Sequence, residues 1–291
     1  MAFERHESSI YRCARCAVEF SSPQPTDARL AEIYSSEYFL GSEGPEAARR
    51  VTELKRATAG LYLDIIRPLV KAASPKLLEI GCGSGDFLCE AQSRGFEVEG
   101  LEYSPHAAAV ANARLSRDVV RTGSLEEIAL PSNAYDVAAA FDVIEHVRNP
   151  GYFLRRLHAA LAPGGAVIIV TPSLDSWSRR LLGRYWMEYK TEHLTYFSRK
   201  ALRHMLEQSG FSDVKFVSNY KVLSIDYVYR HFEKFTVPLL TPVVRLVRRV
   251  LPEGIAHRRL KIVASGTMAL ARKSVTSEAT RDGKNGLLHR G

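Results

Sequence analysis

The sequence lacks any run of about 18 uninterrupted apolar residues, which is the length that a membrane-spanning helix requires. Its first ten residues, MAFERHESSI, place Glu4, Arg5 and Glu7 where a secretory signal needs an apolar stretch. Both absences argue against a membrane-spanning or exported protein. We therefore expect a cytoplasmic protein, with peripheral contact at the inner membrane surface as an open alternative.

Cysteine is scarce, with four residues among 291. Cys13 and Cys16 are too close in sequence for a good mutual bridge, Cys82 lies inside a glycine-rich turn, and Cys89 follows on a predicted helix. This distribution excludes a disulfide framework and fits a reducing compartment.

Hydrophobic residues make up 46% of the chain and aromatic residues 9%, which is enough for one sizeable core with appendages. The net charge of +8 is unevenly distributed. Residues 229–263 contain eight Lys or Arg against two Glu, a local net charge of +6. The excess positive charge therefore indicates what surrounds this one segment rather than a property of the whole protein.

Apolar strands alternate with helical segments through the middle of the chain. Such alternation, with strands that are apolar almost throughout, is typical of a parallel sheet covered on both faces. We predict an α/β fold with a doubly wound, mostly parallel seven-stranded sheet. The predicted strands cover 76–80, 96–102, 118–122, 135–141, 166–171, 213–218 and 265–273, and the helices between them begin at 85, 105, 149 and 198.

The same pattern divides the chain into three parts. Residues 1–45 form an irregular leader with a short helix in 27–39, which Asp27 is expected to cap. Residues 46–273 form the main domain, with a basic, amphipathic helical insertion at 229–263 before the last strand. The polar, aperiodic residues 274–291 are expected to be a disordered tail.

The segment Glu79-Ile80-Gly81-Cys82-Gly83-Ser84-Gly85 joins the first predicted strand to a helix. Its glycines let the backbone turn tightly and approach a ligand closely, and Glu102, at the end of the next strand, can accept two ribose hydroxyls. A dinucleotide site would need Gly or Ala where Asp86 stands. A carboxylate at Glu79 would repel a pyrophosphate but attract a cationic ligand.

With these motifs, residues from about Leu77 to Phe211 resemble the class I S-adenosylmethionine (SAM)-dependent methyltransferases, which have a Rossmann-like fold. YDVAAAFDVIEHV and the turn Pro163-Gly164-Gly165 complete the resemblance. It is strongest to the ubiquinone-biosynthesis O-methyltransferases and to methyltransferases of polysaccharide gene clusters. It implies SAM as cofactor and S-adenosylhomocysteine as product. The implied cofactor-binding residues are Glu79, Gly81, Cys82, Gly83, Gly85, Glu102, Tyr103, Ser124, Leu125 and Asp142.

Methyl transfer to oxygen also requires a group that removes a proton, and His is suited to this task near neutral pH. The candidates are His193, which lies in the region that covers the substrate in similar enzymes, and His146 with its neighbour Glu145. Asp142, Glu145 and His146 could converge on one side of a helical turn, with His193 completing a site for a divalent metal. We do not expect a metal here, because Asp142 stands where the pattern more often has Glu.

The leader resembles a segment that precedes the methyltransferase domain in sugar C-methyltransferases, where a zinc knuckle has four cysteines. Here only Cys13 and Cys16 are present, with His6 as the nearest alternative ligand. A tetrahedral zinc site therefore lacks at least one local ligand, and we expect a degenerate knuckle.

A helical wheel of residues 243–251 separates Val and Leu on one broad face from Arg245, Arg248 and Arg249 on the other. This pattern fits a helix at a membrane interface, a cap over an apolar pocket, or a helix packed on the domain with solvated arginines. No nucleic-acid-binding module accompanies the charge, so we do not expect nucleic acid as a partner.

The sequence thus predicts a SAM-dependent methyltransferase that acts on a small-molecule, lipid-like or glycan acceptor, at oxygen. Alternatives are N- or C-methylation of a sugar or glycolipid precursor, a nicotinamide-dependent oxidoreductase, and a catalytically silent SAM-binding protein. The oligomeric state is left open.

Overall fold

The computed structural model describes residues 3–5, 8–33, 44–234, 236 and 240–275. Its main sheet has seven strands in the order β10-β11-β8-β7-β4-β5-β6. Only β11 runs antiparallel to its neighbours within this sheet, so the predicted α/β fold is confirmed. The strands are β4 (Lys76–Ile80), β5 (Glu97–Glu102), β6 (Val120–Thr122), β7 (Tyr135–Phe141), β8 (Leu161–Pro172), β10 (Phe211–Leu223) and β11 (Leu260–Lys273).

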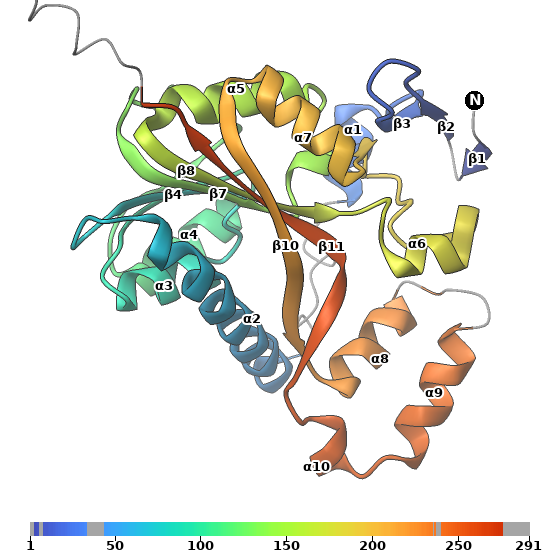
Figure 1. Cartoon of the computed structure of the whole chain (residues 1–291). Coiled ribbons are helices and arrows are strands. Elements are labelled where there is room, and N and C mark those ends of the chain that lie inside the picture. Colours follow the sequence, from blue (N-terminus) through green and yellow to red (C-terminus); the bar gives the residue numbers. More distant parts are fainter. Residues whose placement is uncertain (1–2, 6–7, 34–43, 235, 237–239, 276–291) are drawn as a thin grey trace, which may run out of the picture.

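Helices cover both faces of this sheet, with α2, α3 and α4 on one side and α5 and α7 on the other (Figure 1). Ser104, Asn149 and Ser198 precede α4, α5 and α7, and each side chain accepts a hydrogen bond from the backbone of the first turn. The helices are α2 (Pro45–Ile66), followed by the 3-10 helix η1 (Arg67–Leu69), α3 (Asp86–Ser93), α4 (Pro105–Leu115), α5 (Pro150–Ala160) and α7 (Arg199–Gln208).

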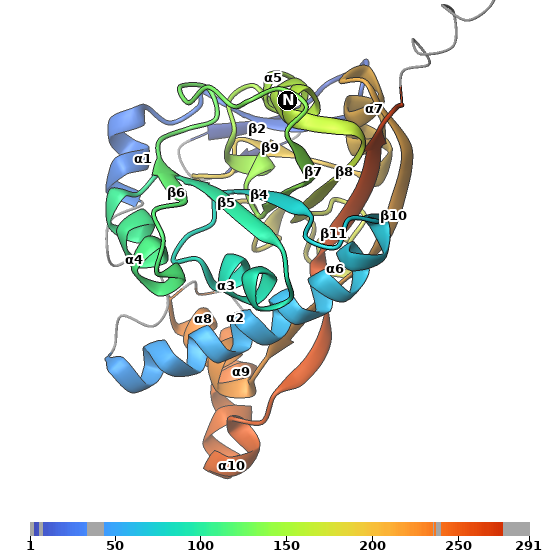
Figure 2. The same ribbon diagram turned by 90° about the vertical axis from the view of Figure 1, so that its left-hand side faces the viewer.

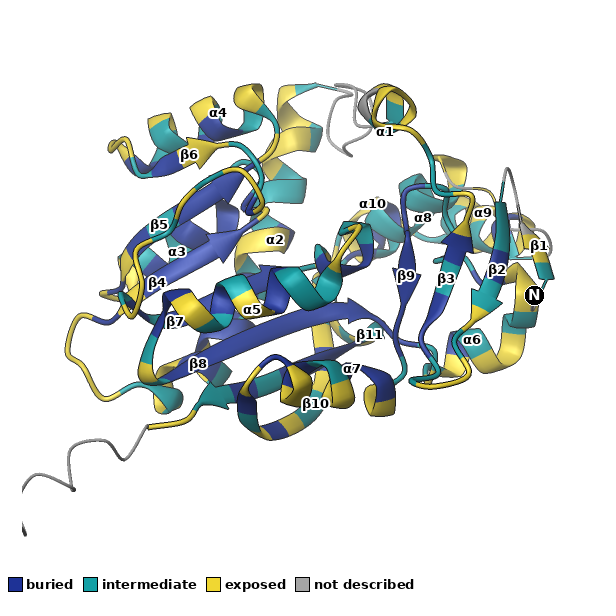
Figure 3. Cartoon of the chain, turned by 90° about the horizontal axis from the view of Figure 1, so that it is seen from above, coloured by how far each residue is buried: buried dark blue, intermediate teal, exposed yellow. Residues whose placement is uncertain are grey.

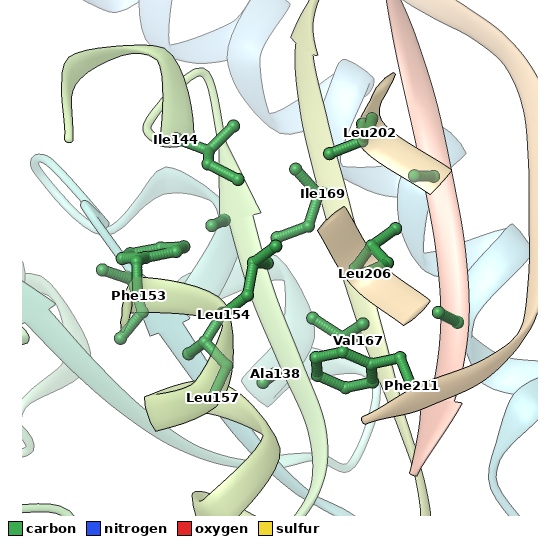
Figure 4. Close-up of a cluster of buried hydrophobic side chains, with 14 of the residues drawn as sticks. Ala138, Ile144, Phe153, Leu154, Leu157, Val167, Ile169, Leu202, Leu206 and Phe211 are labelled. Carbon is green, nitrogen blue, oxygen red and sulfur yellow. The ribbon is translucent and has the colours of Figure 1, made fainter. Parts of the chain in front are cut away.

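Strand β7 separates two hydrophobic cores. Ala138 and Ala140 enter the cluster beneath α5 and α7, whereas Val137 and Ala139 enter the cluster beneath α2 and α3. Figure 4 shows the first cluster, where side chains of α5 and α7 meet those of β7 and β8. Burial on both faces explains why these strands are apolar almost throughout their length (Figure 3).

The leader forms a second sheet, so the expectation of an irregular segment is wrong. Its strands are β1 (Phe3–Arg5), β2 (Ser8–Arg12) and β3 (Glu19–Ser22), and β9 (Thr195–Tyr196) pairs with β3 as the fourth strand. Helix α1 (Asp27–Ile33) follows, and Thr26 rather than Asp27 caps it, because its hydroxyl accepts from the Arg29 amide. Residues 34–43 lie outside the described residues.

Aromatic side chains join this small sheet to the segment between β8 and α7, which contains α6 (Trp177–Leu182) and η3 (Gly183–Tyr185). Trp186 and Tyr189 pack with leader residue Ile10 in a separate cluster. The Tyr189 hydroxyl donates to Glu19 of β3 at 2.7 Å. The leader therefore braces the segment that contains His193.

Beyond the main sheet, β10 and β11 continue as a two-stranded arm that carries three helices, α8 (Ile225–Lys234), α9 (Leu240–Val250) and α10 (Glu253–Ala256). The arm projects away from the sheet in Figure 2. Both strands are longer than the predicted 213–218 and 265–273. Among the described residues, no helix has the length and apolar character to cross a membrane. Of the expected tail, residues 276–291 lie outside the described part of the chain.

Candidate active site

The glycine loop lies between β4 and α3 at the carboxyl end of the sheet, where ligands bind in doubly wound folds. Gly81, Gly83 and Gly85 all have positive φ, at 70°, 54° and 77°. A Cβ on Gly81 would lie 2.6 Å from Cγ2 of Val143, so this glycine brings the loop against the turn after β7. A Cβ on Gly83 would meet nothing within 4 Å, so Gly83 borders open space.

Glu79 places a buried carboxylate at the base of this loop. Its side chain is 4% exposed, and Oε2 has no hydrogen-bond partner among the described residues. Burial raises the pKa of Glu79 well above its usual range, and the charges of Asp86 and Glu102 raise it further. An unpartnered buried carboxylate favours a cationic ligand, so the site fits the ammonium group of SAM.

Glu102, at the end of β5, has its carboxylate held by the backbone. Oε2 accepts from the Gly83 amide at 2.7 Å and Oε1 from the Ser104 amide at 2.9 Å. These contacts fix both oxygens beside the glycine loop and leave lone pairs for ribose hydroxyls. Tyr103 next to it is 64% exposed, whereas Cys82 is buried, which raises the pKa of its thiol and keeps it neutral.

The two residues expected near the adenine differ in their surroundings. The Ser124 amide and hydroxyl both point to Oε2 of Glu127, at 3.1 and 3.0 Å, so the hydroxyl already donates a bond. Leu125 is buried in the main core. Gly123 donates its amide to the Glu102 carbonyl at 2.9 Å and so holds this turn beside Glu102.

Sequence reasoning missed the ion pairs that hold the glycine loop. Asp86 pairs with Arg114 of α4 at 2.7 Å and lies 3.8 Å from the ammonium group of Lys55 on α2. Arg114 also donates to the carbonyl of Ser84 at 2.9 Å. No local pattern links positions 28 residues apart, so the sequence held no signal for this contact. The carboxylate of Asp86 thus stands where a dinucleotide-binding loop would have its third glycine.

His146 and His193 meet beyond the carboxyl end of β7, with ring centroids 4.7 Å apart. His146 belongs to the 3-10 helix η2 (Ile144–His146), and its Nδ1 lies 3.0 Å from the carbonyl oxygen of Glu192. Nδ1 of His193 lies 2.8 Å from the carbonyl oxygen of Glu188. Since a carbonyl only accepts, both Nδ1 atoms carry the proton, and each neutral ring has an unprotonated Nε2.

Burial lowers the pKa of His146, and it lowers that of His193 well below its usual value. The positive charges that His146 and Lys190 can carry add to the effect on His193. Both rings are therefore neutral at physiological pH and can accept a proton.

Glu145 completes a cluster with the two histidines. Its Oε2 accepts from the Thr171 hydroxyl at 3.0 Å, whereas Oε1 has no hydrogen-bond partner among the described residues. The ligand atoms of Glu145, His146 and His193 all lie within 4.8 Å of one another. Two imidazoles and one carboxylate, with both Nδ1 atoms held by carbonyls, form a donor set that suits a divalent cation.

Asp142 does not join this cluster as the sequence suggested. It follows β7 with a φ of 54°, and its Oδ2 accepts from the ammonium group of Lys221 at 2.6 Å. Burial alone would lower the pKa of Lys221, but the charge of Asp142 reverses this effect and raises it. Lys221 comes from β10, and its place beside the site had no signal in the sequence.

Cys13 and Cys16 lie on the turn between β2 and β3. The backbone amides of Cys16 and Arg15 point to the Cys13 sulfur and lower its pKa. Across the described ranges, the group of three metal-ligating side chains includes neither cysteine. His6, the alternative ligand, lies outside the described residues.

Residues 53–215, more than half of the chain, match the family described as "Methyltransferase domain". The chain belongs to this family. The predicted membership of the class I SAM-dependent methyltransferases, with SAM as the cofactor, is therefore confirmed. The match argues against the nicotinamide-dependent alternative.

The chain is similar to curated proteins such as a ubiquinone biosynthesis O-methyltransferase from Bradyrhizobium sp., to which it is 33% identical over 147 residues, 48% of this chain and 56% of the relative. The mitochondrial ubiquinone biosynthesis O-methyltransferase of Schizosaccharomyces pombe is 36% identical over 127 residues, 41% of this chain and 44% of the relative. The chain spans about half the length of the curated relatives it matches.

Two solved structures support the fold. The YcgJ protein from Bacillus subtilis has a TM-score of 0.52 at 15% identity and covers 75% of this chain and 98% of its own. A SAM-dependent methyltransferase from Archaeoglobus fulgidus has a TM-score of 0.50 at 17% identity, with 75% and 94% covered. At these identities the likeness concerns the fold alone.

Proposed function

We propose that the protein transfers the methyl group of SAM to a hydroxyl oxygen of a small or amphipathic acceptor. The observation that carries this proposal is the pair His146 and His193, two neutral imidazoles with unprotonated Nε2 atoms. His146 closely follows Val143, which lies against Gly81 of the glycine loop, and the ring of His193 packs against that of His146. The names of the two curated O-methyltransferases support the choice of oxygen.

On the cofactor side, two carboxylates would each bind one part of SAM. Glu79 would bind the ammonium group, and Glu102 would accept the ribose hydroxyls. SAM supplies an activated methyl group, which makes positioning the main requirement. Ion pairing of Asp86 with Arg114 keeps the loop between these two carboxylates in place.

On the acceptor side, the hydroxyl oxygen forms the new bond to the methyl carbon as the carbon–sulfur bond breaks and its electron pair returns to sulfur. The hydroxyl proton passes to Nε2 of His193 or His146. Their lowered pKa values keep them available for this task at neutral pH. Lys190 and Glu188 lie at the same site, since their charges act on His193 and Glu145.

The unpartnered Oε1 of Glu145 favours a second assignment for the same cluster. Glu145, His146 and His193 would hold a divalent cation, which would orient the acceptor oxygen and favour its deprotonation. The sequence led us to expect no metal, and that expectation is open. Calorimetric titration with Mn²⁺ distinguishes the two: binding that Glu145→Gln abolishes supports the cation site, and no binding leaves the histidines as proton acceptors.

The function itself is tested by calorimetric titration with SAM, S-adenosylhomocysteine and NADH. We expect micromolar binding of the two adenosyl ligands, loss of that binding in Glu102→Ala, and no binding of NADH. The control is Glu97→Gln, at the exposed opposite end of β5. An acceptor screen with methyl-labelled SAM then separates methylation at oxygen from that at nitrogen or carbon of a sugar or glycolipid precursor. A protein that binds SAM and yields no product would be a silent binder.

A further inference from the structure

Helix α9 turns its apolar face to solvent. Val243, Leu246, Val247 and Val250 are 56%, 64%, 40% and 68% exposed, and their spacing places them on one face of the helix. We call these four residues the apolar stripe of α9. A helix packed on a soluble domain normally buries such a face, so this orientation is the reverse of the usual one.

The arginines of α9 hold it in this orientation. Arg248 lies mostly inward and donates to the buried Asp226 at 3.1 Å and to Glu253 at 2.7 Å. Arg245 donates to Glu233 of α8 at 2.6 Å. Both arginines thus form ion pairs with α8 and α10 of the same arm, and a rotation of α9 that buried the apolar stripe would break these ion pairs.

Helix α6 and the turn after it present a second exposed set. Trp177, Leu181 and Tyr185 recur every four residues and are 64%, 71% and 50% exposed, with Arg180 and Arg184 exposed beside them. Figures 1 and 3 place α6 and α9 at the same end of the molecule, the end toward which β8 runs. The glycine loop lies at this end too, because it follows β4, which runs parallel to β8 in the sheet.

We propose that this end of the molecule binds an anionic lipid bilayer, with the apolar stripe of α9 and the aromatic side chains Trp177 and Tyr185 entering the interface. Arg249 on α9 and Arg258 and Lys261 on the same arm are exposed, and their charges complement anionic headgroups. A second copy of the chain is a poorer occupant, since two such basic surfaces would repel each other.

The test is flotation of the full chain with vesicles of phosphatidylcholine alone and with about 30% phosphatidylglycerol. We expect binding to the anionic vesicles only, weakened by high salt, and a loss of at least tenfold in the partition coefficient for the double variant Leu246→Asp/Val250→Asp. The matched control is Val275→Asp, which alters an exposed apolar residue near the Gly164 turn, at the opposite end of β8. Circular dichroism and SAM titration verify that each variant is folded.

An absence of flotation, or equal flotation of wild type and the stripe variant, would overturn the proposal. So would a dimer in solution that Leu246→Asp converts to a monomer while vesicles are not bound. Vesicle binding requires neither SAM nor methyl transfer, so its outcome is separate from that of the proposed function.

Discussion

Glu79→Gln replaces the buried carboxylate at the base of the glycine loop with a neutral side chain of the same shape. Oε2 of Glu79 has no hydrogen-bond partner among the described residues, so the substitution breaks no hydrogen bond between them at that atom. The substitution should therefore have opposite effects on the affinity for SAM and on the stability of the ligand-free protein. SAM binding should weaken, whereas the ligand-free fold should become more stable at neutral and higher pH.

The loss of affinity follows from one buried charge-assisted bond. Hydrogen bonds to charged groups contribute about 1.5–3 kcal/mol, which corresponds to an increase of about 10- to 150-fold in Kd for SAM. Affinity of the wild type should rise with pH until Glu79 is ionised, because the ammonium group binds the charged form. In Glu79→Gln this component of the pH dependence should be absent.

The stability change has a definite sign. The pKa of Glu79 is raised in the folded state, so the folded chain holds this proton more tightly than the unfolded chain does. The stabilisation is fully present below the unfolded pKa and is lost as pH rises through the folded pKa. The variant lacks this loss, so its Tm relative to wild type should increase as the pH rises above the usual glutamate pKa of about 4.3.

Calorimetric titration with SAM and thermal unfolding over this pH range measure both effects, with Glu97→Gln as the exposed control. An unchanged Kd would refute the role of Glu79 in binding the ammonium group. A difference in Tm that stays constant with pH would refute the raised pKa.

Three further substitutions test other parts of the site. His193→Ala should lower kcat by about 10²- to 10⁴-fold and leave the Kd for SAM nearly unchanged. In a pH–rate profile of the wild type, the rate should fall only below the usual histidine pKa of about 6.5, because the pKa of His193 is lowered. Lys221→Met leaves Asp142 uncompensated, which should raise the pKa of His146 and move the acid limb of that profile to higher pH. Trp186→Ala should destabilise the fold by about 3–5 kcal/mol, measured by urea unfolding, because Trp186 of the β8–α7 segment is fully buried in a cluster with leader residue Ile10.

The main sheet and the cofactor side of the site could be predicted because their signals are local. Alternating strands and helices specify the doubly wound sheet, and the glycine loop follows β4 directly. Glu102 ends the next strand, so the fold itself brings it beside Gly83. Each of these inferences requires only the order of elements along the chain.

Contacts between distant segments could not be predicted in this way. Strand β3 pairs with the two-residue strand β9, more than 170 positions later, and neither has an alternation long enough to specify a partner. The ion pair of Asp142 with Lys221 depends on β10 being longer than its apolar pattern. For α9, the helical wheel separates apolar residues from arginines, but Asp226 and Glu233, two acids on α8, decide which face is inward.

The acceptor side of the site rests on the segments that lie outside the shared glycine motif. The Leu194 amide donates to the carbonyl of Glu145 at 2.7 Å, and the amide of Ser21 in the leader donates to the carbonyl of Leu194 at 3.0 Å. The leader therefore helps to fix His193 against His146 through one continuous set of backbone bonds. Under the proposed function, the leader and the β8–α7 segment, which hold these groups, would select the acceptor, and neither belongs to the cofactor motif. A change of acceptor could arise there with the SAM site left intact.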